Sequence, residues 1–203
     1  MKTIAVFEFN KAPLSEGIIR VSRIIRPDFP VEQVNAQLRL LVAEARKTIQ
    51  AGDYIETQVS TLLKLFYRDW LFSGVTGVYL LSKALWLDKV LIARQGATVS
   101  LGTIFLHVAT QLQLPVILII VLTQLILCVR REDGSYWYIN PINGETLTEQ
   151  ILDLWVKGTI SPFANLTRKD IEETAHRIII RKMFDTIKAA LMEEKNGTSA
   201  KSL

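Results

Sequence analysis

The sequence predicts an α+β protein that is mostly helical and carries a small antiparallel sheet. Apolar residues recur at intervals of three and four over the first seventy residues and again after Thr167, the period of a helix with one buried face. β-branched residues crowd the stretch from Val116 to Val129. The segment EDGS, residues 132–135, is a strong hairpin signal, and SYWYIN supplies a returning strand.

The first half of the chain is expected to be helical. Residues 28–30 form a turn between a short amphipathic helix and a longer helix that ends near Gly52. The first of these helices carries an arginine stripe on its wet side, which is either an anionic docking face or a solvated edge. A third helix is expected from about Thr57 to Trp70, and the helical pattern resumes in LSKALWLDKVLIAR until Gly96.

The second half begins with a helix that the pattern predicts to start at Ser100, whose hydroxyl can cap free N–H groups. Pro115 ends this helix, and the apolar run after it fits one strand buried on both faces or two strands with a break near Thr123. A helix is expected over residues 145–157. Thr167 and Asp170 resemble a capping signal for a long last helix. Its apolar face would contain Ile171, Ala175, Ile178, Ile179, Phe184, Ile187 and Leu191.

The stretch LPVILIIVLTQLILCVR raises the question of a membrane span. A spanning helix needs roughly 20 mostly apolar residues. The window that would supply them includes Gln111, Gln113, Pro115 or Gln124 and stops at Arg130. The proline, the β-branched residues and the hairpin that follows favour buried strands in a soluble core, so no membrane span is expected.

The net charge and the cysteine content narrow the classes of partner and metal site that the chain is expected to have. The formal net charge of +4 is mild, and the basic residues lack the clustering expected of a specific nucleic-acid binder. Cys128 is the one cysteine, which excludes an intrachain disulfide and a cysteine-based metal site. The first residues lack the apolar core of a secretory signal. These features predict a cytoplasmic protein with no metal and no cofactor.

Few residues carry recognisable chemistry. His107 follows Ser100 by seven residues, or about 10 Å along a helix, so the two cannot form a nucleophile and base pair. We expect His107 to be partly buried with a local hydrogen-bond partner, and His176 to be exposed on the last helix. Cys128 is expected inside an apolar strand with a raised thiol pKa. No phosphate loop, dinucleotide motif or GxSxG elbow is present.

A resemblance to a known family adds information on fold and function that the spacing of apolar residues does not give. The segments WLDKVLIARQGATVSLGTIFLHVATQLQLP, TQLIL and WYINPINGE, with FEFNKAPL before them and IRKMFDTIKAALMEE after them, resemble the bacterial SirB-type, YchA-like family of transglutaminase-like domains. The resemblance covers about residues 7–194. It implies a transglutaminase-like (papain-like) core, and it matches the N-terminal domain of relatives that often continue into tetratricopeptide-like repeats.

The wider superfamily places a Cys nucleophile at the start of a core helix, a His on the following strand and an Asp on the next. By resemblance these positions fall on Ser100, Gln124 and Asn140. Gln124 cannot accept a proton at neutral pH, and Asn140 lacks the charge that would stabilise an imidazolium. Ser100 without a base is a poor nucleophile. The trio is either a retained binding pocket or a structural remnant in which Ser100 caps a helix and the two amides tie the strands.

Two function classes follow from the resemblance. The first is a catalytically inactive transglutaminase-like domain that works as a protein-interaction or regulatory module with an unknown protein partner. The alternative is an unconventional serine hydrolase or acyltransferase that uses Ser100, activated by a group that sequence alone does not identify. The expected organisation is a helical region over residues 1–75, a core with its last helix over 76–195 and a frayed tail over 196–203. Exposed apolar residues between Ile179 and Leu191 would permit homo-oligomers.

Overall fold

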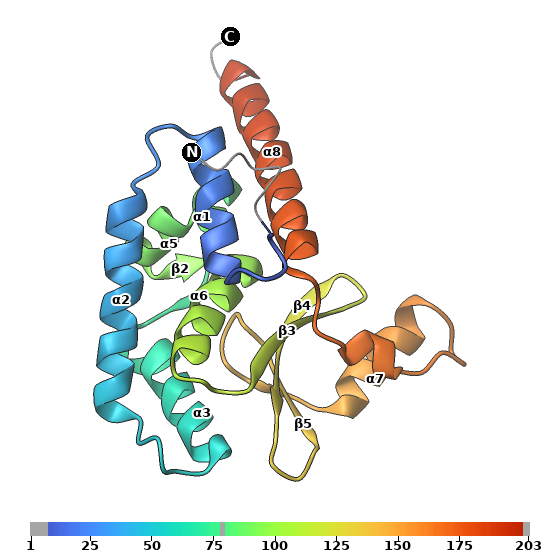
Figure 1. Ribbon diagram of the computed structural model, residues 1–203. Helices are drawn as coiled ribbons and strands as arrows, with labels where there is room; N and C mark the ends of the chain where they lie inside the picture. Colours follow the sequence, from blue (N-terminus) through green and yellow to red (C-terminus); the bar gives the residue numbers. More distant parts are fainter. Residues whose placement is uncertain (1–7, 78–79, 201–203) are drawn as a thin grey trace.

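The computed structural model describes residues 8–77 and 80–200, and it confirms a mostly helical α+β fold (Figure 1). The first half of the chain contains α1 (Leu14–Ile25), α2 (Val31–Thr48), α3 (Ile55–Lys64), the π-helix η2 (Leu65–Asp69), β1 (Ser73–Gly74), α4 (Leu81–Leu85), α5 (Leu87–Ala93) and β2 (Gln95–Gly96). The second half contains α6 (Thr98–Gln111), β3 (Val116–Val121), β4 (Gln124–Arg130), β5 (Tyr136–Ile139), β6 (Thr146–Leu147), α7 (Glu149–Thr159), the 3-10 helix η3 (Arg168–Ile171) and α8 (His176–Ala200).

The apolar run after Pro115 forms two antiparallel strands, which confirms the predicted break near Thr123. Strands β3 to β6 follow one another in a four-stranded antiparallel sheet. Val121 pairs with Gln124 across a two-residue turn, in which Leu122 takes a left-handed φ of 58°. The predicted EDGS turn joins β4 to β5, with Gly134 at a φ of 82° that favours glycine.

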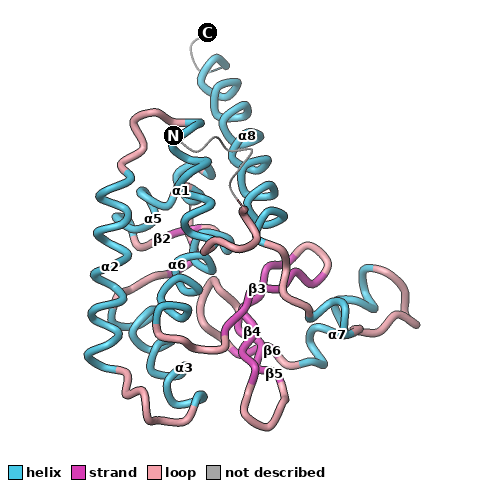
Figure 2. The backbone as a smooth tube through the Cα atoms, viewed as in Figure 1, coloured by secondary structure: helices cyan, strands magenta, loops and turns pink. Residues whose placement is uncertain are grey.

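Both faces of this sheet are covered, so the run is apolar at almost every position. The sheet lies between α7 and the larger group of helices (Figure 2). Leu118, Leu127 and Val129 face the main core, whereas Ile119, Ile126, Cys128 and Tyr138 face Leu152 and Val156 of α7. This alternation is the period-two pattern of a strand with two buried faces. Within residues 8–77 and 80–200, the helices lack the combination of length and hydropathy that crossing a membrane requires.

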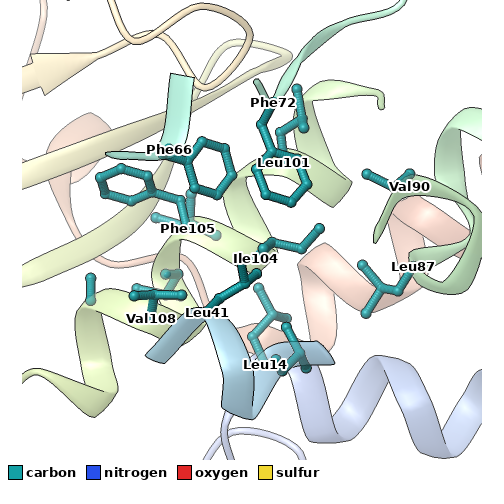
Figure 3. Close-up of a cluster of buried hydrophobic side chains, with 14 of the residues drawn as sticks. Leu14, Leu41, Phe66, Phe72, Leu87, Val90, Leu101, Ile104, Phe105 and Val108 are labelled. Carbon is teal, nitrogen blue, oxygen red and sulfur yellow. The ribbon is translucent and has the colours of Figure 1, made fainter. Parts of the chain in front are cut away.

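Helix α6 lies at the centre of the main core. Leu101, Ile104 and Phe105 are fully buried, and they lie among side chains of α1, α2, η2 and α5 (Figure 3). Phe66 stacks on Phe72 with 4.4 Å between ring centroids and meets Phe105 edge to face at 5.3 Å. The aromatic residues near position 70 therefore serve packing of the core. Helices α1 to α3 share one continuous core with α6; the division of the chain near residue 75 stays a prediction.

Four expected elements differ from the observed ones. The helix expected over 57–70 is an α-helix that ends at Lys64 and continues as the π-helix η2. The helical pattern expected over residues 81–94 is broken at Trp86, whose extended backbone separates α4 from α5. The helix expected over 145–157 begins at Glu149, where Thr148 supplies the cap. The Thr167 and Asp170 capping box exists, but it caps the short helix η3.

Helix α8 begins at His176, eight residues after η3 starts, because the segment between them crosses β3, where Thr174 N–H donates to Leu118 O at 2.9 Å. The apolar face of α8 packs on α1 and α4. Ile179, Met183 and Ile187 are each 1% exposed, so the premise that the apolar residues of this helix are free for self-association is wrong for most of them. Ile178 and Met192 stay exposed. The oligomeric state itself stays a prediction.

Candidate functional site

Ser100 is a buried hydrogen-bond donor in the first turn of α6. The helix starts two residues earlier than predicted, because Ala97 N–H donates to Ala84 O and Ala97 becomes the N-cap residue. Ser100 therefore does not cap the helix. Its Oγ donates to Leu85 O at 2.8 Å, and the residue is 0% exposed. The Ser100 hydroxyl thus ties α6 to the end of α4.

Gln124 and Asn140 occupy different surroundings. Gln124 is exposed at the first position of β4. Asn140 is half-buried, and its Oδ1 accepts a hydrogen bond from Ile142 N–H at 3.0 Å. Its carbonyl accepts from Gly144 N–H at 2.8 Å. Asn140 thus organises the turn between β5 and β6, to which Tyr67 Oη also donates at Pro141 O, at 2.8 Å.

The structure does not join the three positions into one constellation. Among the described residues, no hydrogen bond links any two of Ser100, Gln124 and Asn140. Gly102, two residues after Ser100, faces the sheet: a Cβ there would lie 3.3 Å from Leu118 and 3.4 Å from Leu125. The side chains of residues i and i+2 in a helix point about 200° apart around the helix axis. The Ser100 side chain accordingly points away from the strand that carries Gln124.

Thr98 occupies the place expected for Ser100. It is half-buried at the first position of α6 and lines a cavity of about 200 Å³ together with Gln124. The rest of the lining comes from α4, the start of α6, the β3–β4 hairpin and α8 (Leu81, Leu85, Ala97, Val99, Ile120, Thr123, Leu125, Ile179, Lys182, Met183 and Thr186). Sequence reasoning missed Thr98 because threonine and serine both favour helix starts, and the pattern alone could not choose between them. This hollow is called the α6 cleft below.

Helix α8 forms one wall of the α6 cleft. Lys182 Nζ donates to Thr123 O at 2.6 Å, which ties the middle of α8 to the tip of the β3–β4 hairpin. Lys182 is the one ionisable side chain in the lining. An ammonium group that is already bonded to a carbonyl is a donor and accepts no proton. Within the described lining, Thr98 and Gln124 therefore meet no general base.

The two histidines depart from their expected surroundings. His107 is half-buried, and burial lowers its pKa. Its partner is Ser15, with 2.9 Å between Oγ and Nδ1, so the contact spans 92 residues and is not local. The side chain of His176 is only 17% exposed, and its Nδ1 lies 2.9 Å from Ala12 O. The expected exposure of His176 is wrong, because the chain preceding α1 packs over the start of α8.

Both histidines line the same cavity. Its volume is about 340 Å³, and Ser15, Thr103, Thr110 and Glu173 contribute to its polar lining. In the part of the chain that the structure describes, no cluster of three His, Cys, Asp or Glu side chains is arranged to hold a metal ion. Cys128 is fully buried, and burial raises its thiol pKa to about 12, as predicted.

Comparisons with known proteins identify the family. A family model described as the transglutaminase-like superfamily matches residues 32–185. The UPF0162 protein YchA of Escherichia coli is 50% identical over 194 residues, which cover 96% of this chain and 72% of the relative. Protein SirB1 of Salmonella typhimurium is 49% identical over 195 residues, with the same coverage. A UPF0162 protein of Vibrio cholerae is 30% identical over 193 residues, which cover 95% of this chain and 72% of the relative. No solved structure gives a significant match. The chain belongs to the transglutaminase-like superfamily and, within it, to the SirB-type, YchA-like family.

Proposed function

We propose that this chain is a catalytically inactive transglutaminase-like domain that works as a cytoplasmic protein-interaction or regulatory module. One observation carries the proposal. The hydroxyl at the family's nucleophile position, on Ser100, is fully buried and donates to Leu85 O. A nucleophile needs a free approach for the substrate carbonyl and a base within hydrogen-bond reach, and Ser100 has neither.

The other two family positions support the same reading. Gln124 has an amide where the family has an imidazole, and an amide takes no proton at neutral pH. Asn140 Oδ1 accepts a hydrogen bond from Ile142 N–H inside a turn. In the described part of the chain no hydrogen bond links either residue to Ser100, so there is no hydrogen-bonded route for a proton between these positions.

The α6 cleft is the proposed docking point for a protein partner. Its lining combines apolar side chains from α4 and α8 with the polar groups of Thr98, Thr123 and Gln124. A pocket with an apolar body and a few polar groups suits one anchoring side chain of a partner, since such anchors carry much of an interface's binding energy. The exposed Gln124 at its rim gives access to a partner's surface.

The test is an affinity capture from native lysate with quantitative mass spectrometry. Gln124→Trp fills the rim of the cleft at an exposed strand position that tolerates an aromatic residue. Glu132→Trp, in the exposed β4–β5 turn, is the matched control. A partner lost from Gln124→Trp and retained by Glu132→Trp is expected. A partner set unchanged by Gln124→Trp would contradict docking at the α6 cleft.

The competing proposal is a serine hydrolase or acyltransferase that uses Ser100. It requires acyl chemistry that disappears in Ser100→Ala while the fold is retained. If the chain is an interaction module, any acyl chemistry measured for the wild-type protein should be unchanged in Ser100→Ala.

A further inference from the structure

A serine and a histidine outside the α6 cleft meet at hydrogen-bond distance. Ser15 lies in the first turn of α1 and His107 on α6, with 2.9 Å between Ser15 Oγ and His107 Nδ1. This is the separation expected of a nucleophile and its general base. The described residues place no carboxylate in hydrogen-bond contact with the other ring nitrogen, so the arrangement is a pair and not a triad.

The surroundings of His107 favour a neutral imidazole. Burial lowers the pKa of His107, so the ring is largely uncharged near pH 7. A neutral imidazole has one nitrogen that accepts a hydrogen bond. We assign the acceptor to Nδ1, with the Ser15 hydroxyl as donor and the ring proton on Nε2. In this tautomer His107 can take the proton of Ser15.

The start of α1 supplies donors for a developing negative charge. Pro13 is the N-cap residue of α1, and no side chain caps the helix. The first N–H groups of a helix have no acceptor within it, and here these belong to Leu14 and Ser15. Backbone N–H groups beside a nucleophile can stabilise the oxyanion that forms when a carbonyl is attacked.

Two hollows meet at this pair. The cavity of about 340 Å³ that contains both histidines lies on one side, and an open groove of about 650 Å³ runs along α1 on the other. Ser15 is only 4% exposed, but unlike Ser100 it lines two hollows, and His107 lines both of them as well. The groove continues past Ile19 and Ile24, beside the cationic Arg23 and beside Arg20, which pairs with Glu16 at 3.3 Å. Its chemistry fits an apolar acyl chain with an anionic group close by.

We propose that Ser15 and His107 form a nucleophile and base pair that hydrolyses carboxylic esters or thioesters with an apolar acyl chain and an anionic leaving group. Ser15 Oγ attacks the carbonyl carbon and its proton passes to His107 Nδ1. The bond from the carbonyl carbon to the leaving oxygen or sulfur breaks, and His107 returns the proton to that atom. Water then hydrolyses the acyl-serine by the same proton route, which releases the carboxylic acid and restores Ser15. The inactivity proposed above concerns the family's nucleophile position at Ser100, whereas this pair lies between α1 and α6.

The test uses the purified full chain and a fluorophosphonate probe, with the modified serines located by peptide mass spectrometry. Ser60 is the internal control, because it is exposed on α3 and has no histidine partner. Ser15 is expected to react at least about 100-fold faster than Ser60, since a positioned base contributes roughly 10²–10⁴ in rate. His107→Gln should lower the Ser15 rate by a similar factor. Ser22→Ala changes another serine of α1 and should keep the Ser15 rate.

The labelling rate of the wild-type chain should also follow the protonation of His107. The charged or titratable groups that face this pair are Glu16, Arg20 and Arg23 from α1, and Glu173 and His176 from the segment that enters α8. The rate is expected to fall on acidification with a midpoint below pH 6.5, and a midpoint at or above that value would contradict His107 as the base.

Two further results would overturn the proposal: labelling of Ser15 no faster than Ser60 in the native chain, or a Ser15 rate unchanged in His107→Gln. The first of these needs no variant, so a folding defect in His107→Gln cannot hide it. Fast labelling of Ser100 in the same map would contradict the inactivity proposed for Ser100. The labelling of Ser15 tests the Ser15 and His107 pair independently of that result.

Discussion

Replacing Ser100 with alanine separates a structural role of this residue from a catalytic one. The Ser100 hydroxyl is the donor that the structure gives to Leu85 O, and both residues are buried, at 0% and 2% exposure. Ser100→Ala removes the donor and leaves a buried carbonyl unpaired, which costs about 1–3 kcal/mol. For a domain of this size, a loss of about 2 kcal/mol corresponds to a decrease in Tm of roughly 4–8 °C.

The assay is urea unfolding followed by circular dichroism, with Tm as a second measure. Ser60→Ala is the matched control, because this exposed helical serine is expected to change stability by no more than about 0.5 kcal/mol. A Ser100→Ala variant as stable as Ser60→Ala would refute the reasoning. It would mean that the bond to Leu85 O contributes nothing and that Ser100 is available for another role.

Three other predictions concern charges and the thiol. Asp88 is 4% exposed and pairs with Arg26 at 2.5 Å. Asp88→Asn leaves the Arg26 guanidinium, which is 22% exposed, with the longer contact to the exposed Asp28 at 3.6 Å, so the fold should be destabilised by about 3 kcal/mol in urea unfolding; a loss below about 1 kcal/mol would contradict this. Burial raises the pKa of Cys128 to about 12, so Ellman's reagent should fail to react with the native protein at pH 8 and should react with one thiol after denaturation. Burial lowers the pKa of His107, so on acidification the unfolded state binds a proton more readily than the folded state does. The free energy of unfolding should therefore fall as the pH drops from about 7.5 through 6.5. His107→Gln should weaken this dependence in unfolding measured between pH 5.5 and 7.5. An identical pH dependence in wild type and His107→Gln would show that other groups cause it.

Local patterns in the sequence predict the sheet well. The β-branched run and the EDGS turn determine β3, β4 and β5 through short-range effects, namely strand propensity and the turn geometry that Gly134 permits. Alternation between two buried faces explains why the run carries no charge. A membrane helix and a two-faced strand share this composition, and the hairpin signal distinguished them.

The helix boundaries were harder to predict because tertiary contacts decide them. Trp86 divides a pattern that looks continuous, and its ring packs against Phe29 and Phe184. Ala97 N–H bonds to Ala84 O, and that bond moves the start of α6 ahead of Ser100. Neither contact is encoded in neighbouring residues.

Tertiary contacts limit the prediction of the candidate sites even more than that of the helix boundaries. The family resemblance gives no side-chain directions, so it assigns Ser100 to the cleft that Thr98 lines in the structure. The contact between Ser15 and His107 joins residues 92 positions apart. No spacing rule connects such residues, and packing of α1 on α6 alone brings them together.

The inactivity proposed at Ser100 is tested most directly by measuring acyl transfer and hydrolysis in parallel for the wild-type chain and Ser100→Ala. Amine incorporation into a glutamine-containing protein and hydrolysis of a nitrophenyl ester are the two readouts, with circular dichroism confirming that both proteins are folded. We expect no amine incorporation and equal hydrolysis rates in the two proteins. A rate that falls by about 100-fold or more in a folded Ser100→Ala variant would contradict the claim, because it would make Ser100 a nucleophile.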